Sequence, residues 1–125
     1  YPIRYSGYME RSLAITALGA LAQTTRLETF RTLVRHEPKG VPAGELARML
    51  DVPQNTMSAH LATLSRAGLV TSERQSRSII YRADLDGLRE LTLFLLKDCC
   101  GGSTELCAPL IAELTPCCAS EVEKS

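Results

Sequence analysis

The sequence lacks any long hydrophobic run and any cysteine before residue 99. No apolar stretch in the 125 residues approaches the ~18 that are needed to span a bilayer. The N-terminus also lacks the charged and then apolar pattern of a secretory signal. Five cysteines, an odd number, do not suit a secreted disulfide framework. We therefore expect a cytoplasmic protein with reduced thiols and no membrane partner.

The chain also lacks net charge, because it holds 14 basic and 14 acidic side chains. The distribution is nevertheless uneven. Residues 1–80 contain ten Lys and Arg against six Asp and Glu, whereas residues 81–125 contain four against eight. For DNA binding, where the charges lie matters more than their total. A DNA-binding segment is therefore expected in the basic part of the chain.

Helical periodicity dominates the first part of the sequence. Apolar side chains recur at helical spacing in residues 10–22 and again after Thr24 or Thr25, either of which can cap a second helix. Pro38 and Gly40 then end that helix. We expect the core to include Ala14, Ala17, Leu18 and Leu21 from the first helix, and Leu27, Phe30, Leu33 and Val34 from the second.

Two further helices are predicted around the tight turn of residues 51–53. The helix before it is short, with Leu46, Met49 and Leu50 inward. The helix after it repeats Met57, Leu61 and Leu64 on one face and is polar on the other. This arrangement is typical of a helix-turn-helix, although an ordinary solvated helix in a small bundle would show the same pattern.

The outer face of the helix after residue 53 carries short and amide side chains. Asn and Gln can pair bidentately with adenine, while a methyl group of Ala or Thr can contact thymine. His60 lies on the flank, where it would pack or contact a phosphate rather than bind metal. The predicted base-reading or phosphate-contacting residues are Gln54, Asn55, Thr56, Ser58, Ala59, His60 and Thr63.

After Gly68, which suits a helix C-cap, the apolar pattern changes to that of strands. Residues 69–74 and 78–82 read as two short strands joined through residues 75–77. A hairpin that follows a recognition helix is typical of a wing, with Arg74 and Arg77 placed to contact phosphate or the minor groove. Alternatively, these arginines only keep an edge strand soluble.

Four segments together carry a family resemblance. They are residues 21–27 (LAQTTRL), 45–47 (ELA), 58–70 (SAHLATLSRAGLV) and 80–82 (IYR). With them, residues 10–98 resemble the winged-helix metalloregulators of the ArsR/SmtB family. The resemblance implies a mainly α fold with a small β-hairpin, and a homodimer formed by the first and last long helices. It also implies a repressor that leaves its operator DNA when a metal or metalloid binds.

The sequence departs from the metal sites that this resemblance would supply. The family's best-known arsenic site is a cysteine motif in the third helix, but residues 43–48 contain no cysteine. Its zinc sensors use Asp and His along the last long helix, yet residues 84–98 contain no histidine. Asp84, Asp86, Glu90 and Asp98 offer only oxygen ligands there. A sensing function must therefore depend on the cysteines near the C-terminus or be missing. Asp51 also stands where the family usually has a turn glycine, and Asp tolerates the left-handed conformation that such a turn uses.

Those cysteines gather at a predicted helix end. A helix capped by Asp84 should end near Cys99 and Cys100, because Gly101 and Gly102 follow. Cys107 falls near the start of a further short helix, where the dipole favours a thiolate. Three soft sulfurs suit a trivalent thiophilic ion, As(III) or Sb(III), and some arsenic-responsive members of the family carry a similar cysteine set. Cys117 and Cys118 are secondary candidates, as accessory ligands or a second site.

Other interpretations of the thiols stay open. Cys99 and Cys100 could be small buried residues at a dimer interface. The cysteines could form a disulfide in a redox sensor, or bind Zn(II) or Cd(II) if Cys117 or Cys118 supplied a fourth ligand. An enzyme is disfavoured, because both histidines are far from the cysteines in sequence, and no organic cofactor is expected.

The sequence thus predicts three regions. Residues 1–8 are a tag remnant or a native arm, residues 9–98 a winged helix-turn-helix domain for DNA binding and dimerisation, and residues 99–125 a sensing segment. The expected partner is double-stranded operator DNA, with a palindromic site read by a homodimer. The expected function is a transcriptional repressor that As(III) or Sb(III) releases, derepressing a metalloid-resistance operon.

Overall fold

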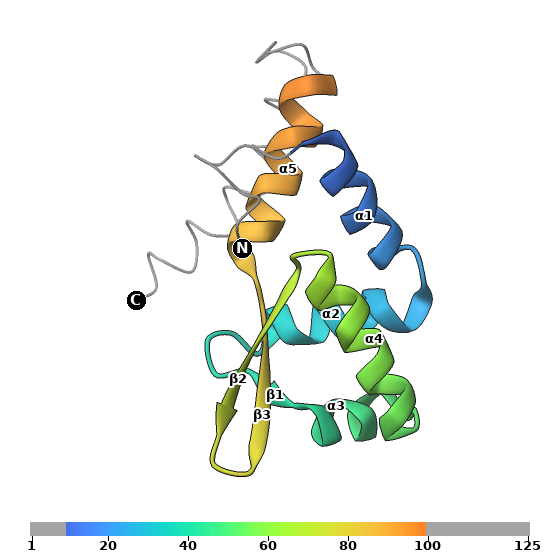
Figure 1. The fold of residues 1–125 in the computed structure, drawn as a ribbon, viewed down its shortest axis with the longest axis vertical. Coiled ribbons are helices and arrows are strands. Elements are labelled where there is room, and N and C mark those ends of the chain that lie inside the picture. The colour runs from blue at the N-terminus through green and yellow to red at the C-terminus, as the bar shows by residue number, and fades with distance from the viewer. Residues whose placement is uncertain (1–9, 100–125) are drawn as a thin grey trace, which may run out of the picture. The chain divides into compact units, whose positions relative to one another are not determined.

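The computed structural model describes residues 10–99, with side chains up to residue 96. Contacts divide the chain into two units, Tyr1–Leu91 and Thr92–Ser125. The first unit contains four helices, a three-stranded antiparallel sheet and the beginning of α5 (Leu85–Cys99). The second unit begins within α5. The predicted winged helix-turn-helix is confirmed (Figure 1).

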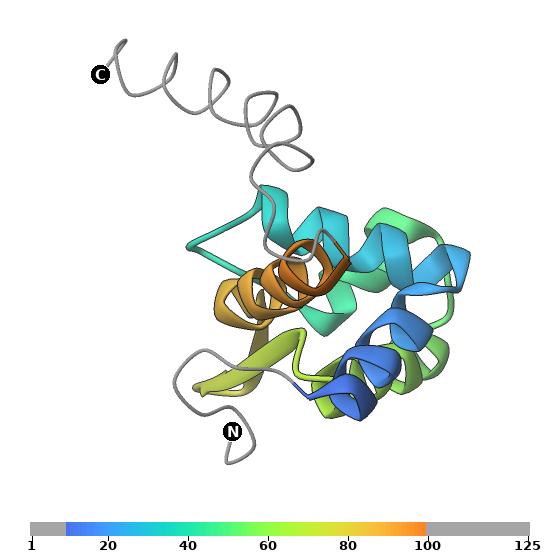
Figure 2. The same ribbon diagram turned by 90° about the horizontal axis from the view of Figure 1, so that it is seen from above.

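Four helices build the body of the first unit. They are α1 (Arg11–Leu21), α2 (Thr24–Arg35), α3 (Ala43–Leu50) and α4 (Gln54–Arg66). The helix α4 contacts each of the other three, and it lies beside α1 in Figure 2. Apolar side chains at helical spacing meet at the centre, so burial fixes which face of each helix turns inward. The largest fully buried apolar side chains are Leu33, Leu46, Met57, Leu61, Leu64 and Leu69.

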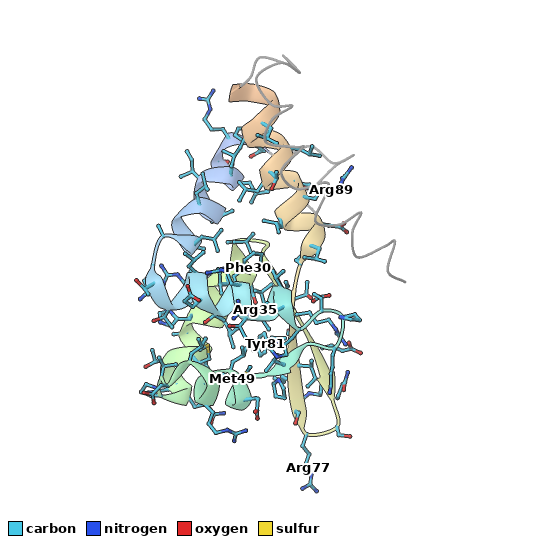
Figure 3. All side chains as sticks on the ribbon, turned by 180° about the vertical axis from the view of Figure 1, so that it is seen from behind. Phe30, Arg35, Met49, Arg77, Tyr81 and Arg89 are labelled. Atoms are coloured by element: carbon cyan, nitrogen blue, oxygen red, sulfur yellow. The ribbon has the colours of Figure 1, made fainter. Side chains whose placement is uncertain are left out.

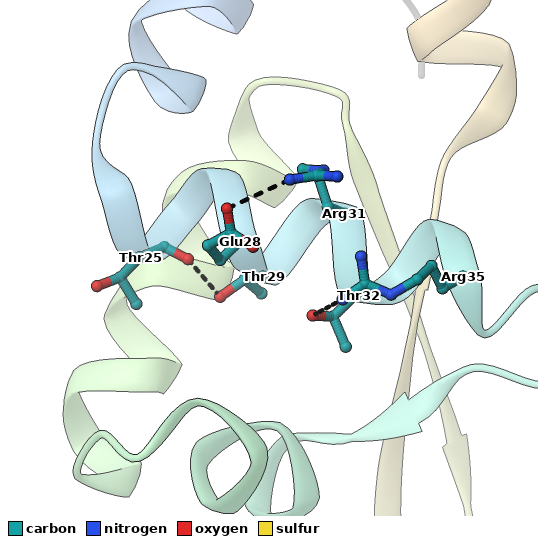
Figure 4. A network of polar contacts seen from close by, with 6 residues as sticks. All are labelled: Thr25, Glu28, Thr29, Arg31, Thr32 and Arg35. Carbon is teal, nitrogen blue, oxygen red and sulfur yellow. Dashed lines mark hydrogen bonds and ion pairs between the residues drawn. The ribbon is translucent and has the colours of Figure 1, made fainter.

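Threonines inside α2 are buried without loss of hydrogen bonding. The Thr29 hydroxyl donates to the carbonyl oxygen of Thr25 at 2.7 Å, and Thr32 Oγ1 accepts from Arg35 Nη2 at 3.2 Å (Figure 4). On the outer side of the same helix, Arg31 forms an ion pair with Glu28 at 3.5 Å. A buried hydroxyl is costly only when it lacks a partner, so α2 can present Thr29 to the core.

The sheet holds the wing against the body. Its strands are β1 (Val41–Pro42), β2 (Val70–Gln75) and β3 (Ser78–Ala83), in the order β1-β3-β2. The predicted hairpin is confirmed, with a tighter turn in which Ser76 takes a positive φ of 57°. The sequence did not predict β1, which pairs Val41 with Tyr81. This pairing joins the base of the hairpin to the segment between α2 and α3.

The predicted turn residues behave as expected. Asp51 ends α3 in the left-handed region, with φ 57° and ψ 50°, and Gly68 follows α4 with φ 78°. Pro53 is the N-cap residue of α4 and directly precedes its first residue, Gln54. The Asp84 carboxylate accepts the backbone N–H of Gly87 at 3.1 Å and so caps α5.

Some residues predicted to be in the core are exposed in this chain. Leu18 on α1 is 41% exposed and Met49 on α3 is 44% exposed. Leu27 and Val34 on α2 are also exposed. Periodicity identified the apolar face of each helix, but part of each face extends beyond the neighbours that cover it. Within residues 10–99, no helix is both long enough and apolar enough to cross a membrane.

Candidate nucleic-acid interface

The outer face of α4 is exposed as a continuous surface. Met57, Leu61 and Leu64 are completely buried and anchor the helix. Most of the predicted DNA-contacting residues lie on the opposite side. Five of them are exposed and two, His60 and Thr63, are half-buried; the exposed ones are Gln54, Asn55, Thr56, Ser58 and Ala59.

Two polar side chains on α4 are held by the helix backbone. Asn55 Oδ1 accepts the backbone N–H of Thr56 at 2.9 Å, which fixes its carbonyl end at the start of the helix. The Thr63 hydroxyl donates to the carbonyl oxygen of Ala59 at 3.2 Å. Because the hydroxyl of Thr63 is engaged with the backbone, its methyl group is the part suited to an outside contact. Each of these side chains therefore has a hydrogen bond to the backbone of its own helix.

A groove separates the start of α4 from the wing. This helix–wing groove has a volume of about 440 Å³ and brings together Gln54, Ser58 and Arg77 from two distant parts of the sequence. Each of these residues was predicted separately to contact DNA. The full lining is Pro42, Ala43, Gly44, Gln54, Ser58, Arg77, Ser78, Ile79 and Tyr81.

The first turns of α3 and α4 meet at the helix–wing groove. Pro42 precedes α3 and Pro53 precedes α4, and neither helix has a side-chain hydrogen bond at its N-cap. The first backbone N–H groups of a helix lack partners within the helix and carry partial positive charge. The Gln54 amide lies next to Gly44 of α3, and its Nε2 would be in ordinary contact, at 3.7 Å, with a Cβ at that glycine. Backbone and side-chain donors therefore occur together on this surface.

The wing contributes arginines at its far end. Arg77 extends from the tip of the hairpin (Figure 3), in the turn between β2 and β3. Arg74 is exposed on β2 opposite Ile79, and it does not line the helix–wing groove. Arg77 therefore lines the same groove as α4, whereas Arg74 lies elsewhere on the wing.

His60 lies on the flank of α4 and has a protein partner. Arg26 Nη1 on α2 donates to His60 Nδ1 at 3.4 Å. Burial and the neighbouring charge of Arg26 both lower the pKa of His60, and burial is the larger cause. The neutral imidazole is therefore favoured, with Nδ1 as the acceptor, since a guanidinium can only donate.

Sequence reasoning missed the groove residues on β3 and α3. Tyr81 and Ile79 line the helix–wing groove from the wing, and Ala43 and Gly44 line it from α3. The strand pattern placed Tyr81 in a hairpin but gave no sign that β1 would pair with it. Without that pairing, the position of the wing against α3 could not be inferred.

The predicted thiol site cannot be located in the described part of the chain. Cys99 is the last residue of α5 and its side chain is not described, while Cys100, Cys107, Cys117 and Cys118 lie outside the described residues. Among residues that the structure does describe, no three His, Cys, Asp or Glu side chains are grouped to hold a metal ion. A metalloid site at the cysteines stays a prediction.

Comparisons with known proteins agree with the fold. A helix-turn-helix domain family matches residues 21–73. The chain is 34% identical over 68 residues to the transcriptional activator HlyU of Vibrio cholerae, a match that covers 54% of this chain and 60% of HlyU. The chain therefore spans about 60% of the length of that relative.

Solved structures show the same architecture. An ArsR-like transcriptional regulator from Rhodococcus sp. RHA1 aligns with a TM-score of 0.65 and 28% identity, over 78% of this chain and 89% of that one. A protein described as a "Possible transcriptional regulator for arsenical resistance" aligns with a TM-score of 0.57 and 29% identity, over 63% and 79%. Together, the helix-turn-helix match, the relative and these structures show that the chain has a winged helix-turn-helix fold similar to that of ArsR-like transcriptional regulators.

Proposed function

We propose that this protein is a transcriptional repressor that binds operator DNA as a homodimer and is released by As(III) or Sb(III). The observation that carries the DNA-binding part is the helix–wing groove. It places the amide of Gln54, the hydroxyl of Ser58 and the guanidinium of Arg77 around one opening. These groups are the types that hold phosphates and read base edges.

The proposed binding mode follows from the shape of the surface. The exposed side of α4 enters the major groove, where Asn55 and Gln54 can read adenine and the methyl groups of Ala59 and Thr63 can meet thymine. The wing lies along the backbone, so that Arg77 contacts phosphate or the adjacent minor groove.

The dimer is proposed from the apolar surface of α1. Ile15 is 62% exposed and Leu18 is 41% exposed on this helix. A second copy of the chain would bury these side chains, which a monomer leaves in water. A two-fold dimer presents two copies of α4 to successive major grooves, about 10 base pairs apart, and so reads a palindrome. A dimer bound there would occlude a promoter.

The inducer is proposed from the cysteines. Cys99, Cys100 and Cys107 offer three thiolates, the ligand set that suits a trivalent thiophilic ion. A structural neighbour is described as a "Possible transcriptional regulator for arsenical resistance". If the metalloid-bound form holds the two copies of α4 at a spacing that DNA does not favour, metalloid and DNA weaken each other's binding reciprocally. Repression then lifts when arsenite appears.

The experiment has two steps. First, the reduced protein selects duplexes from a random-sequence library, and a recovered duplex is labelled for a mobility-shift assay. Second, the complex is titrated in parallel with arsenite, zinc and peroxide. The proposal expects palindromic duplexes and release by arsenite. Selection of no duplex would contradict DNA binding, whereas release only by zinc or only by peroxide would contradict the metalloid and favour a zinc or a redox sensor.

A further inference from the structure

One arginine side chain, that of Arg26, links three helices behind the candidate DNA-binding surface through two hydrogen bonds. Arg26 on α2 donates from Nε to the carbonyl oxygen of Ala20 in the last turn of α1, at 2.7 Å. The same guanidinium donates from Nη1 to His60 Nδ1 on α4, at 3.4 Å. Ala20 is buried and both Arg26 and His60 are half-buried, so these bonds are partly shielded from water.

The end of α1 needs the charge that Arg26 supplies. The last carbonyl groups of a helix have no partner within it, and the helix dipole makes this end negative. No basic residue lies in the last turn of α1 itself. Arg26 therefore satisfies a carbonyl of α1 from the following helix, and its backbone N–H is fixed by Gln23 Oε1 at 2.9 Å. Its guanidinium has little freedom to move.

On its inner side, helix α4 also has a weak directional contact, from the Thr29 hydroxyl on α2 to Met57 Sδ at 3.7 Å. Its buried anchors are Met57, Leu61 and Leu64, and apolar contacts of this kind are not directional. Such contacts hold a helix in place but tolerate a small rotation about its axis. A hydrogen bond is directional, and one made from the flank of the helix resists that rotation.

We propose that Arg26 and His60 are positioning residues that set the rotation of α4, and thereby the direction in which its exposed face meets DNA. His60 affects DNA binding through its bond to Arg26, which sets the rotation of α4, and does not itself contact the DNA. This inference rests on the DNA-binding part of the proposed function and does not depend on the inducer.

The test measures DNA affinity without arsenite, on the full chain and a duplex recovered by selection. The variants are Arg26→Met, His60→Leu, both together, and His60→Asn, whose Oδ1 can replace Nδ1 as the acceptor. Arg31→Met is the matched control, because Arg31 is an exposed arginine on the same helix. Urea unfolding of each variant ensures that only folded protein is compared.

We expect His60→Leu to weaken binding about fivefold, the size of one lost hydrogen bond, and Arg26→Met to weaken it at least as much, because it also removes the bond to the Ala20 carbonyl. The double variant should lose no more than Arg26→Met alone, because the contact that His60→Leu removes is already absent there. His60→Asn should recover part of the loss. The slope of log affinity against log salt should stay the same, since no phosphate contact is removed. By NMR, the pKa of His60 should rise when Arg26 is replaced.

Three results would overturn the inference. Additive losses in the double variant would show that Arg26 and His60 act independently of each other. A salt slope that falls by about 1 in His60→Leu would show that His60 contacts a phosphate directly. Unchanged affinity in both single variants would show that the contact serves stability alone. Failure of the wild-type protein and of Arg31→Met to bind any duplex would instead overturn the proposed function itself, and this inference with it.

Discussion

Arg82 on β3 donates from Nη1 to Glu73 Oε1 on β2 at 2.6 Å, across the two strands of the wing. The same guanidinium donates from Nε to the carbonyl oxygen of Pro38 at 2.9 Å. Arg82 therefore joins the wing to the turn between α2 and β1. The position of the wing, and hence of Arg77, depends on this contact as well as on the pairing of β1 with β3.

Replacing Arg82 should loosen the base of the wing. For Arg82→Gln, we expect the free energy of unfolding to fall by about 1 kcal/mol, because a part-buried charged donor is lost. Urea denaturation measures the change. Arg89→Gln on α5 is the control, since Arg89 is exposed, and it should change stability by less than about 0.5 kcal/mol. Equal effects of the two substitutions would show that the Arg82 contacts contribute nothing.

Two glycines with similar backbone angles should respond differently to alanine. Gly40 has φ 81°, and a Cβ there would meet Ile80 Cγ2 at 2.7 Å and the Tyr81 carbonyl oxygen at 2.8 Å. Gly68 has φ 78° with no atom within 4 Å of that position. Gly68→Ala should cost roughly 1–2 kcal/mol from backbone strain alone. Gly40→Ala should cost about 1–3 kcal/mol more, because β3 must also shift. Equal urea midpoints for the two variants would contradict the close packing at Gly40.

The main elements of the fold could be predicted from local patterns. The repeat of Met57, Leu61 and Leu64 identified α4. The turn residues Asp51 and Gly68 marked where the helix before α4 and α4 itself end. These signals lie within a few residues of the elements that they specify. Helix capping by Asp84 was predictable for the same reason.

What could not be predicted depends on residues far apart in the sequence. Strand β1 has two residues, one of them a proline, and exists only because β3 pairs with it. The contact between Arg26 and His60 joins positions 34 residues apart. Exposure of Met49 was likewise hidden, because periodicity shows which face is apolar but not what covers it. Of these features, the pairing of β1 with β3 involves residues that line the helix–wing groove, Pro42 and Tyr81 among them.

The role of Arg77 should be visible in the salt dependence of DNA binding. Arg77→Gln should weaken binding to all sequences and reduce the slope of log affinity against log salt by about 1, because one phosphate contact is lost. Gln54→Ala should instead keep the slope and change the preferred base in a selection experiment. A slope that does not change in Arg77→Gln would show that the wing tip does not contact phosphate.

The lowered pKa of His60 has a consequence for stability. In the unfolded chain the imidazole titrates near its ordinary value of 6.5, while in the folded protein burial and Arg26 place its pKa lower. The contribution of the neutral His60 to the free energy of unfolding is therefore complete above pH 6.5. It is lost as the pH falls toward the pKa of the folded protein, because the unfolded state binds the proton first.

The measurement for His60 compares urea unfolding of the wild-type protein and of His60→Asn at pH 7.5 and pH 5.5. The stability advantage of the wild-type protein should shrink at the lower pH. The comparison isolates His60, since all other titrating groups are common to both proteins. An advantage that is the same at both pH values would contradict the lowered pKa.

Arsenite-driven release through the cysteines is the central claim, and fluorescence anisotropy of a selected duplex tests it most directly. The reduced protein is bound to the duplex and titrated with arsenite, for the wild-type chain, for Cys99→Ser/Cys100→Ser/Cys107→Ser, and for Cys117→Ser/Cys118→Ser as the matched comparison. We predict that arsenite releases the wild-type protein and the Cys117/Cys118 variant, while the triple variant stays bound. Release of the triple variant, or no release of the wild-type protein, would contradict the account.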